Sequence, residues 1–431
     1  MKRPLLRCLP SLLLGIFLTT FINFILYNNE KQSFTSPQDD WEKIYEMLEK
    51  YSQPWVKNEN KHKEIRDWKL LNTQLQQHHV KNKITGSYKE IKEKSKGIEI
   101  CSEDSQVWKN KNQEIDKKPP QRNDPQSCQD CREKIEEILQ NYSQPWVKDE
   151  KKLQEIRTGL RVNCNGLENA IITQKNSPMG TKIVYDGDKG HTLKVNSQHF
   201  ATFVKMHQIL NKTLHSCAVV GNGGILANSK CGHQIDSAEF VIRCNLAPLL
   251  NGYEEHVGMK TDIVTANPSI LSKRYDSLLG SRRRFVESLC QYGDAMLLLP
   301  AFSYVVNTAM SFRALHTIDD FEMPLQSAFM NPSYLRSLAV FWGSHGLLEK
   351  RHSTGFMMVS LALELCDNVD LFGFWPFGVH PDSFQNLTHH YYDNNEAKKS
   401  VHVMSDEFKF LLQLHSQGVL NLHLGECGTE E

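Results

Sequence analysis

The chain has no excess of charge of either sign, and several signatures that would classify an enzyme at once are missing. Lys+Arg and Asp+Glu each number 50 among its 431 residues, so a general affinity for nucleic acid is not predicted. A complete GxGxxG fingerprint is absent because Leu226 stands where the third glycine would follow Gly221 and Gly223. A dinucleotide-dependent oxidoreductase is therefore disfavoured. Cys128 and Cys131 form a CxxC without a second pair, which is a weak signal for redox or zinc chemistry.

The chain is long enough for one large core, and a polar stretch falls outside that core. Hydrophobic residues make up 40% of the chain and aromatic residues 9%, which suits one sizeable domain with appendages. Residues 28–127 are rich in Lys, Glu, Asn and Gln and poor in apolar runs, so burial there cannot offset the entropy of ordering. We predict a stem over residues 28–127 and a folded domain over residues 128–431.

An apolar run at residues 8–27 predicts a transmembrane signal anchor. Lys2, Arg3 and Arg7 precede the run, and its length matches the roughly 20 residues that a helix needs to cross a bilayer. A cleaved signal peptide is the alternative, but no small-x-small cleavage pattern closes the run. We expect residues 1–7 to form a cytoplasmic tail and the chain after the anchor to be lumenal.

Cysteines and glycosylation sequons agree with a lumenal location. The chain contains eleven cysteines, and Asn-x-Ser/Thr sequons begin at Asn141, Asn211 and Asn386. An oxidising, glycosylating compartment accommodates both features.

A segment of the stem occurs twice. Residues 42–57 recur as residues 133–148, both ending in Tyr-Ser-Gln-Pro-Trp-Val-Lys. Each copy has apolar residues at helical spacing followed by a proline that should stop the helix. Two copies are too few for a solenoid, so we interpret them as a duplication. Ordered-looking sequence follows the second copy, which we expect to lean on the folded domain.

From about Gly159 onward, short apolar or β-branched runs alternate with helical patterns. This alternation predicts an α/β fold built from βαβ units around a mostly parallel sheet. Ligands of such sheets bind beyond the carboxyl ends of the strands. The predicted strands cover residues 217–220, 239–243, 261–265, 295–299 and 369–373.

Polar residues follow the first two of these strands. A glycine-rich turn at residues 221–224 could let backbone N–H groups approach a phosphate, although a tight structural turn explains the glycines equally well. Asn222 and Asn245 come after neighbouring strands and could read a nucleotide by hydrogen bonds. The alternative is that both amides cap backbone groups in loops.

A long apolar helix is predicted to begin near Phe356. Ser353 or Thr354 is a natural N-cap for it, and the helix amino end could also hold an anion near Gly355. Capping alone explains the Ser and Thr as well.

Aromatic residues and histidines follow the last predicted strand. Trp375 lies in a Phe-Trp-Pro-Phe turn that could wall a sugar or base pocket, His390 starts a His-Tyr-Tyr-Asp tetrad, and His402 precedes Glu407 by five positions. Imidazole suits general base chemistry near neutral pH. The histidine spacings do not resemble a ligand set, so we predict no metal site.

The order and spacing of these segments resemble the animal sialyltransferase family. Residues 217–245, residues 352–377, the tetrad at His390 and the His402/Glu407 pair follow one another as the large, small, third and very small sialyl motifs do. The amino-acid sequence of these motifs is similar to that of the α-2,8 branch, most of all to its type VI member. The resemblance covers residues 164–427.

The resemblance implies a variant nucleotide-binding fold, Rossmann-like and GT-A-like, with a mostly parallel seven-stranded sheet. It also implies an inverting mechanism without metal or cofactor, CMP-sialic acid as the donor, and Golgi residence as a single-pass type II membrane protein. His402 would be the catalytic base, His390 would assist the departing phosphate, and Glu407 would support the last motif. The donor would be bound by Asn222, Asn245, Ser353, Thr354, Gly355 and Trp375.

The resemblance implies two disulfides, Cys217–Cys366 and Cys231–Cys427. The pairing of the remaining lumenal cysteines stays open. They are Cys101, Cys128, Cys131, Cys164, Cys244 and Cys290.

Makers of polysialic acid in this family carry a basic stretch ahead of the small motif, whereas residues 335–348 are largely apolar here. We therefore expect one or a few sialic acids per acceptor. The acceptor, a sialylated glycoprotein or glycolipid, is open between O-glycans, which the resemblance favours, N-glycans and gangliosides. Oligomeric state is open as well, with a homodimer among the alternatives. The rival from another class is a catalytically silent lumenal binding protein that kept the nucleotide-sugar pocket.

Overall fold

The computed structural model describes residues 129–142, 145–205, 214–349, 351–393, 395 and 406–428. All of them belong to one unit, Ser87–Glu431. The expected tail, the anchor at residues 8–27 and the stem at residues 28–127 lie outside the described residues. So do Asn211 and His402. Within the described ranges, no helix is both long and apolar enough to cross a bilayer.

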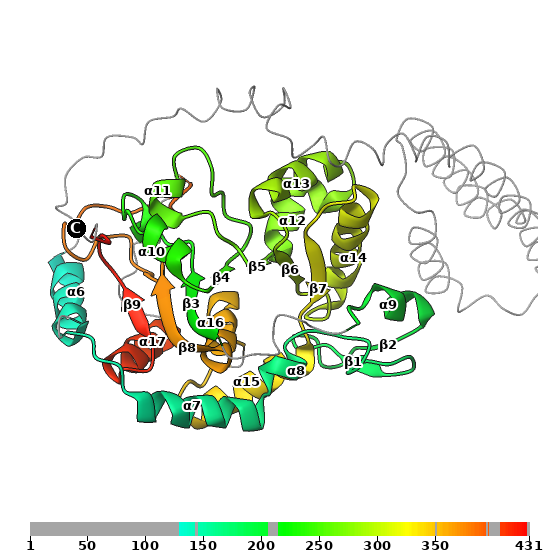
Figure 1. The fold of residues 1–431 in the computed structure, drawn as a ribbon, viewed down its shortest axis with the longest axis horizontal. Coiled ribbons are helices and arrows are strands. Elements are labelled where there is room, and N and C mark those ends of the chain that lie inside the picture. The colour runs from blue at the N-terminus through cyan, green and yellow to red at the C-terminus, as the bar shows by residue number, and fades with distance from the viewer. Residues whose placement is uncertain are drawn as a thin grey trace, which may run out of the picture. The chain divides into compact units, whose positions relative to one another are not determined.

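A seven-stranded sheet forms the centre of the fold, and every neighbouring pair of its strands is parallel. This confirms the expected α/β class with a parallel sheet (Figure 1). The sheet order is β7 (Gln326–Phe329), β6 (Met296–Leu299), β5 (Ile263–Thr265), β4 (Phe240–Arg243), β3 (Leu214–Val220), β8 (Cys366–Phe372), β9 (Asn421–His423).

Both faces of the sheet are buried, because alternate residues of each strand enter different cores. Cys217 and Val219 of β3 face one apolar cluster, and Ala218 and Val220 face the other. The first cluster is covered by α6 (Gln129–Tyr142), α7 (Glu150–Asn163), α15 (Pro332–Ser344), α16 (Thr354–Leu365) and α17 (Asp406–Ser416). The second is covered by α10 (Gly232–Ser237), α12 (Pro268–Tyr275), α13 (Arg282–Leu289) and α14 (Val305–Asp320).

Smaller elements complete the fold. An antiparallel pair, β1 (Lys182–Val184) and β2 (Thr192–Lys194), lies outside the main sheet. The short helices are α8 (Gly166–Asn169), α9 (Ser197–Thr202), η3 (Gly224–Leu226), α11 (Glu254–Val257), η4 (Asp276–Leu278) and η5 (Cys290–Tyr292).

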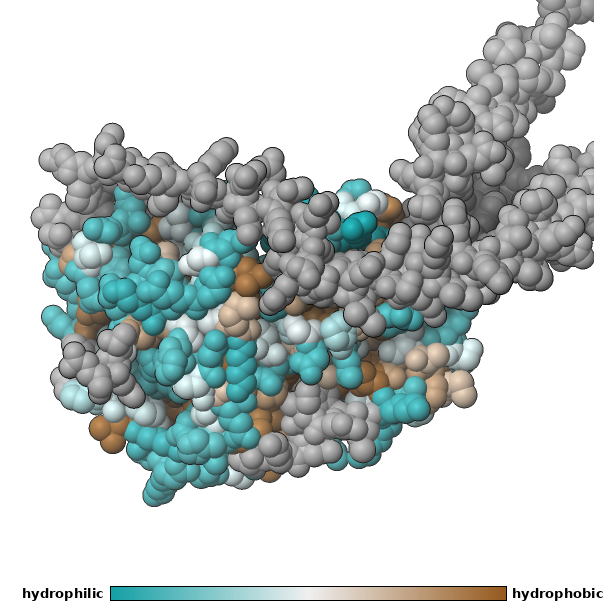
Figure 2. Space-filling view, turned by 45° about the horizontal axis from the view of Figure 1, so that its top comes forward, coloured by the Kyte–Doolittle hydropathy of each residue, from teal (hydrophilic) through white to brown (hydrophobic). Residues whose placement is uncertain are grey.

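Hydrophilic residues dominate the face seen in Figure 2, where hydrophobic residues appear as small separate spots.

The second copy of the duplicated segment packs on the folded unit, as expected. Helix α6 ends at Tyr142, ahead of Pro145. The Tyr142 hydroxyl accepts a hydrogen bond from the Leu424 backbone N–H at 3.2 Å. Trp146 Nε1 donates to the Leu420 carbonyl oxygen at 2.9 Å. The first copy lies outside the described residues.

Two disulfides confirm the expected pairings. Cys217 is bonded to Cys366 across a sequence separation of 149 residues, and Cys231 is bonded to Cys427 across 196 residues. The first joins β3 to the start of β8. The second ties the segment before α10 to the carboxyl end of the described chain.

We predict that removing the Cys217–Cys366 bridge, by changing both residues to Ala, lowers the free energy of unfolding by about 2–5 kcal/mol, because the bridge restricts a very long loop in the unfolded chain. Thermal unfolding of the purified protein measures the change. Cys164→Ala is the matched control, since Cys164 is a buried free thiol. An unfolding temperature as high as that of the control would contradict the prediction.

Candidate active site

The glycine-rich turn after β3 lies against backbone on two sides. A Cβ atom on Gly221 or Gly223 would stand 2.7 Å from the carbonyl oxygen of Gly373, just after β8. A Cβ atom on Gly224 would stand 2.2 Å from the carbonyl oxygen of Thr388. Since such contacts are too short for a side chain, the turn needs glycine for close backbone packing. Close backbone packing therefore explains these glycines without a bound phosphate.

Asn222, Asn245 and Asn267 follow three neighbouring strands, and hydrogen bonds link the loops in which they lie. Asn222 Nδ2 donates to the Cys244 carbonyl oxygen at 2.9 Å. Asn245 adopts a left-handed conformation with φ of 56°, and its Oδ1 accepts from the Asn267 N–H at 3.0 Å. Thr354 Oγ1 donates to Asn267 Oδ1 at 2.9 Å. The network brings together Asn222, Asn245 and Thr354, and sequence analysis missed Asn267 at its centre.

Helix α16 begins as the sequence predicted. Ser353 is its N-cap, and Ser353 Oγ accepts from the Phe356 N–H at 3.2 Å. A Cβ atom on Gly355 would stand 3.0 Å from the ring of Phe374, so the first turn of the helix contacts the turn after β8. Because the amino end of a helix carries partial positive charge, this first turn can stabilise an anion.

His390 lies beside the glycine-rich turn and is oriented by a carboxylate. Gly223 and His390 form an isolated antiparallel bridge, and His390 Nδ1 lies 2.6 Å from Asp393 Oδ2. Burial opposes the ionised form of Asp393, but hydrogen bonds from His390 and Asn395 lower its pKa. The ring of His390 stacks on Tyr392 with a centroid separation of 5.1 Å. An imidazole held at Nδ1 in this way presents Nε2 for proton transfer.

Trp375 is buried, and its side chain belongs to the core. Its ring packs edge-on against Phe377 and Phe408 with centroid separations of 4.8 and 5.6 Å. Its Nε1 donates to the Val379 carbonyl oxygen at 2.8 Å. The indole therefore supports the turn after β8, and a direct contact with a nucleotide stays a prediction.

Glu407 lies in the first turn of α17 and reaches the start of α16. Its Oε1 accepts from the Ser353 N–H at 2.5 Å, which joins the two motifs. His402, five residues earlier, lies outside the described residues.

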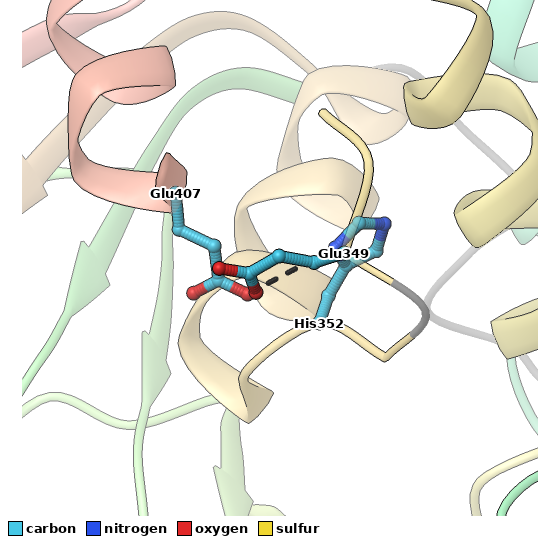
Figure 3. A group of neighbouring side chains, drawn as sticks. All are labelled: Glu349, His352 and Glu407. Atoms are coloured by element: carbon cyan, nitrogen blue, oxygen red, sulfur yellow. Dashed lines mark ion pairs between the residues drawn. The ribbon is translucent and has the colours of Figure 1, made fainter. Parts of the chain in front are cut away.

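A cluster of Glu349, His352 and Glu407 surrounds this junction (Figure 3). Their potential ligand atoms all lie within 4.8 Å of one another. Burial and the nearby Glu407 raise the pKa of Glu349. Burial lowers the pKa of His352, against the pull of Glu349. One imidazole and two carboxylates form a donor set that first-row divalent metals accept, so these three are the described residues that could hold an ion.

The remaining predicted sites are placed as follows. Asn386 is exposed, as a glycan acceptor must be, and Asn141 lies within α6. Cys164 and Cys244 are buried free thiols, and burial raises the pKa of Cys164 to about 11. Cys290 is disulfide-bonded.

Two functional features were missed by sequence reasoning. Asn267 follows a predicted strand and precedes Pro268, a pattern that resembles a simple helix start. Asp393 was part of the histidine tetrad, but its role toward His390 was not assigned. Asn267 could have been identified from its position after a predicted strand, as Asn222 and Asn245 were.

The chain is similar to named α-2,8-sialyltransferases. Mouse "Alpha-2,8-sialyltransferase 8F" is 40% identical over 66% of this chain and 71% of its own length. Human "Alpha-2,8-sialyltransferase 8E" is 43% identical over 65% of this chain and 75% of its own length. "Alpha-N-acetylneuraminide alpha-2,8-sialyltransferase" of Xenopus tropicalis is 41% identical over 69% of this chain and 85% of its own length.

The fold was also compared with a solved structure of a mammalian sialyltransferase in complex with Gal-beta-1-3GalNAc-ortho-nitrophenol. The superposition covers 76% of this chain and 97% of the other chain, with 18% sequence identity and a TM-score of 0.34. Residues 171–419, more than half of the chain, match the model of a single family. The chain therefore belongs to glycosyltransferase family 29, the sialyltransferases.

Proposed function

We propose that this chain transfers sialic acid from CMP-sialic acid to the terminal sialic acid of a glycan, forming an α-2,8 linkage with inversion at the anomeric carbon. The observation that carries the proposal is the network of Asn222, Asn245, Asn267 and Thr354 at the carboxyl ends of the strands. Nucleotides bind at this edge in parallel α/β sheets. The names of the relatives support the α-2,8 linkage.

In the proposed reaction, the bond between the anomeric carbon and the phosphate oxygen of CMP breaks while the acceptor hydroxyl oxygen attacks that carbon from the opposite face. His402 takes the hydroxyl proton. The charge that grows on the phosphate is stabilised by the amino end of α16 and by His390, whose Nδ1 is held by Asp393. Donors already in place for a developing charge lower the barrier without reorganisation.

The proposed setting is the Golgi lumen, with residues 8–27 as a type II anchor and residues 28–127 as a stem. The acceptors are sialylated glycoproteins, O-glycans first, or glycolipids, and each receives one or a few sialic acids because residues 335–348 lack a basic track. A homodimer is compatible with this arrangement.

We predict that the purified protein transfers label from CMP-sialic acid only to acceptors that already end in sialic acid. His402→Ala should reduce this rate by roughly 10²–10⁴-fold while CMP binding is retained, because the general base is lost. His316→Ala on α14 is the control, since His316 is exposed. Binding of CMP without transfer to any acceptor would instead indicate a silent binding protein.

We predict that Asn267→Ala raises the KM for CMP-sialic acid by roughly tenfold, because Thr354 Oγ1 loses the side-chain oxygen to which it donates, while Asn245 Oδ1 keeps its bond from the backbone N–H of residue 267. The KM for the acceptor should change much less. Asn331→Ala is a matched control, because Asn331 caps α15 by accepting from the Ser333 N–H at 3.0 Å. Equal effects of the two variants on donor KM would mean that Asn267 acts only on stability.

We propose that the reaction needs no metal, although Glu349, His352 and Glu407 could hold one. After chelation and dialysis, the purified enzyme should keep its full rate, because the α16 amino end and His390 stabilise the phosphate. A rate that falls and returns with added Mn²⁺ would contradict this proposal. In that case Glu349→Gln should abolish the recovery.

A further inference from the structure

A pocket beside the candidate donor site has no role in the mechanism above. Its volume is about 430 Å³, and it lies between the β1–β2 loop, α15 and the loop before α16. Pockets for small molecules typically measure about 300–1,000 Å³. A slightly larger hollow of about 490 Å³ lies where residues 147–152 meet Ser416 and Gln417. None of the described residues that line that hollow carries a buried polar atom without a partner.

Two residues that line the pocket carry buried polar atoms without hydrogen-bond partners. Asp186 Oδ1 and both ring nitrogens of His352 make no hydrogen bond of good geometry with the described residues, although Ser303 lies close enough to act on the pKa of Asp186 and Leu338 on that of His352. The side chain of Asp186 is 6% exposed, and that of His352 is 1% exposed. An unpaired buried polar group costs about 1–3 kcal/mol. A polyhydroxylated ligand would supply the missing partners.

Three cations line the same pocket, namely Lys189, Arg336 and Arg351. Arg336 donates to the Val184 carbonyl oxygen at 2.7 Å, and its charge also acts on the Asp186 carboxyl group, whose pKa it lowers. Arg351 Nε lies 3.6 Å from Asp186 Oδ2, and its guanidinium lies 4.8 Å from the Tyr304 ring centroid. The Arg351 side chain is 37% exposed, so its remaining N–H groups can reach a ligand.

Acidic residues in the pocket oppose these cations only in part. Burial raises the pKa of Asp186, and the charge of Arg351 acts against that shift. Burial and Glu407 raise the pKa of Glu349, the other acid that lines the pocket. Three guanidinium or ammonium groups therefore face two carboxyl groups that ionise less readily than usual. The net charge favours an anionic ligand.

The floor of the pocket is apolar, with Leu335, Leu347 and Met357 among its residues. Cations, unpaired hydrogen-bonding atoms and an apolar floor together match a sugar that carries a carboxylate, hydroxyls and a methyl group. Sialic acid has all three in its carboxylate, its hydroxyls and its N-acetyl methyl.

The pocket is directly joined to the candidate donor site. Arg351 and His352 line it, and the next residues along the chain are Ser353 and Thr354, which begin α16. His352 Nδ1 also lies 3.9 Å from Glu407 Oε1, the atom that holds the Ser353 N–H (Figure 3). A sugar in the pocket would thus lie next to the donor.

We propose that this pocket binds the terminal sialic acid of the acceptor, with its carboxylate on Arg351 and Lys189 and its hydroxyls on Asp186 and His352. The inference rests on the proposed α-2,8 transfer and names the subsite that makes an acceptor ending in sialic acid the preferred one. These are binding residues, and the chemical step stays with His402 and His390.

The test compares α-2,3-sialyllactose with its carboxylate methyl ester as acceptors for the purified full-length enzyme. The native enzyme should show a KM for the free acid roughly 10–100-fold below that for the ester, because a charge-assisted hydrogen bond is lost in the ester. Arg351→Gln should raise the KM for the acid to about that of the ester and leave the donor KM unchanged. Arg283→Gln, an exposed cation on α13, should behave like the native enzyme.

Loss of transfer by misfolding is separated from loss of binding by two further variants. Asp186→Asn keeps the shape of the side chain and should raise acceptor KM while removing no cation. Lys189→Gln changes an exposed residue and should weaken the preference for the acid without lowering the unfolding temperature.

The outcomes distinguish the two proposals. Transfer to sialylated acceptors with unchanged acid-to-ester preference in Arg351→Gln would overturn the pocket assignment and leave the proposed function intact. No transfer by the native enzyme to any acceptor would overturn the proposed function. Saturation-transfer NMR with sialyllactose and with lactose would then test the pocket by itself, and equal signals from both sugars in the native protein would overturn it.

Discussion

The parallel pairing of β3 with β8 is the constraint on which the candidate site depends. The Cys217–Cys366 bridge joins the middle of β3 to the first residue of β8, and beyond the carboxyl end of β3 the Gly221 N–H donates to the Phe372 carbonyl oxygen at 2.7 Å. The glycine-rich turn and the turn after β8 consequently leave the sheet side by side. Because their close approach admits no Cβ atom, neither turn can shift without the other.

This pairing joins segments that are far apart in the chain, and closing so long a loop costs conformational entropy. The disulfide reduces that cost by restricting the unfolded chain. Buried Arg157 of α7 adds a second tie, since its Nε donates to the Leu363 carbonyl oxygen at 3.0 Å and its guanidinium pairs with Asp367 at 3.0 Å. The helix that follows the duplicated segment is thereby fixed to the junction of α16 and β8.

The sequence predicted the elements that are buried on both faces and missed those at the edges. Strands β3 and β4 consist mostly of apolar residues, whereas the edge strands β7 and β9 contain polar ones, such as Gln326 and Asn421. Asn222 and Asn245 were identified because they follow strands. The pocket residues Asp186 and His352 could not be, since their burial and lack of partners arise from tertiary packing. His402 and the anchor stay predictions.

An enzyme that joins two copies of the same sugar must bind them differently, and the structure offers two unlike environments. The proposed donor edge consists of amides, a hydroxyl and the amino end of α16, which suit a phosphate whose charge grows during reaction. The neighbouring pocket has full charges on Lys189 and Arg351, which suit a carboxylate whose charge does not change. Since Arg351 and His352 run directly into Ser353, a single short segment would set the distance between the acceptor hydroxyl and the donor carbon. Orientation of the two reactants would therefore depend on the rigidity of that segment, which Glu407 supplies by holding the Ser353 N–H.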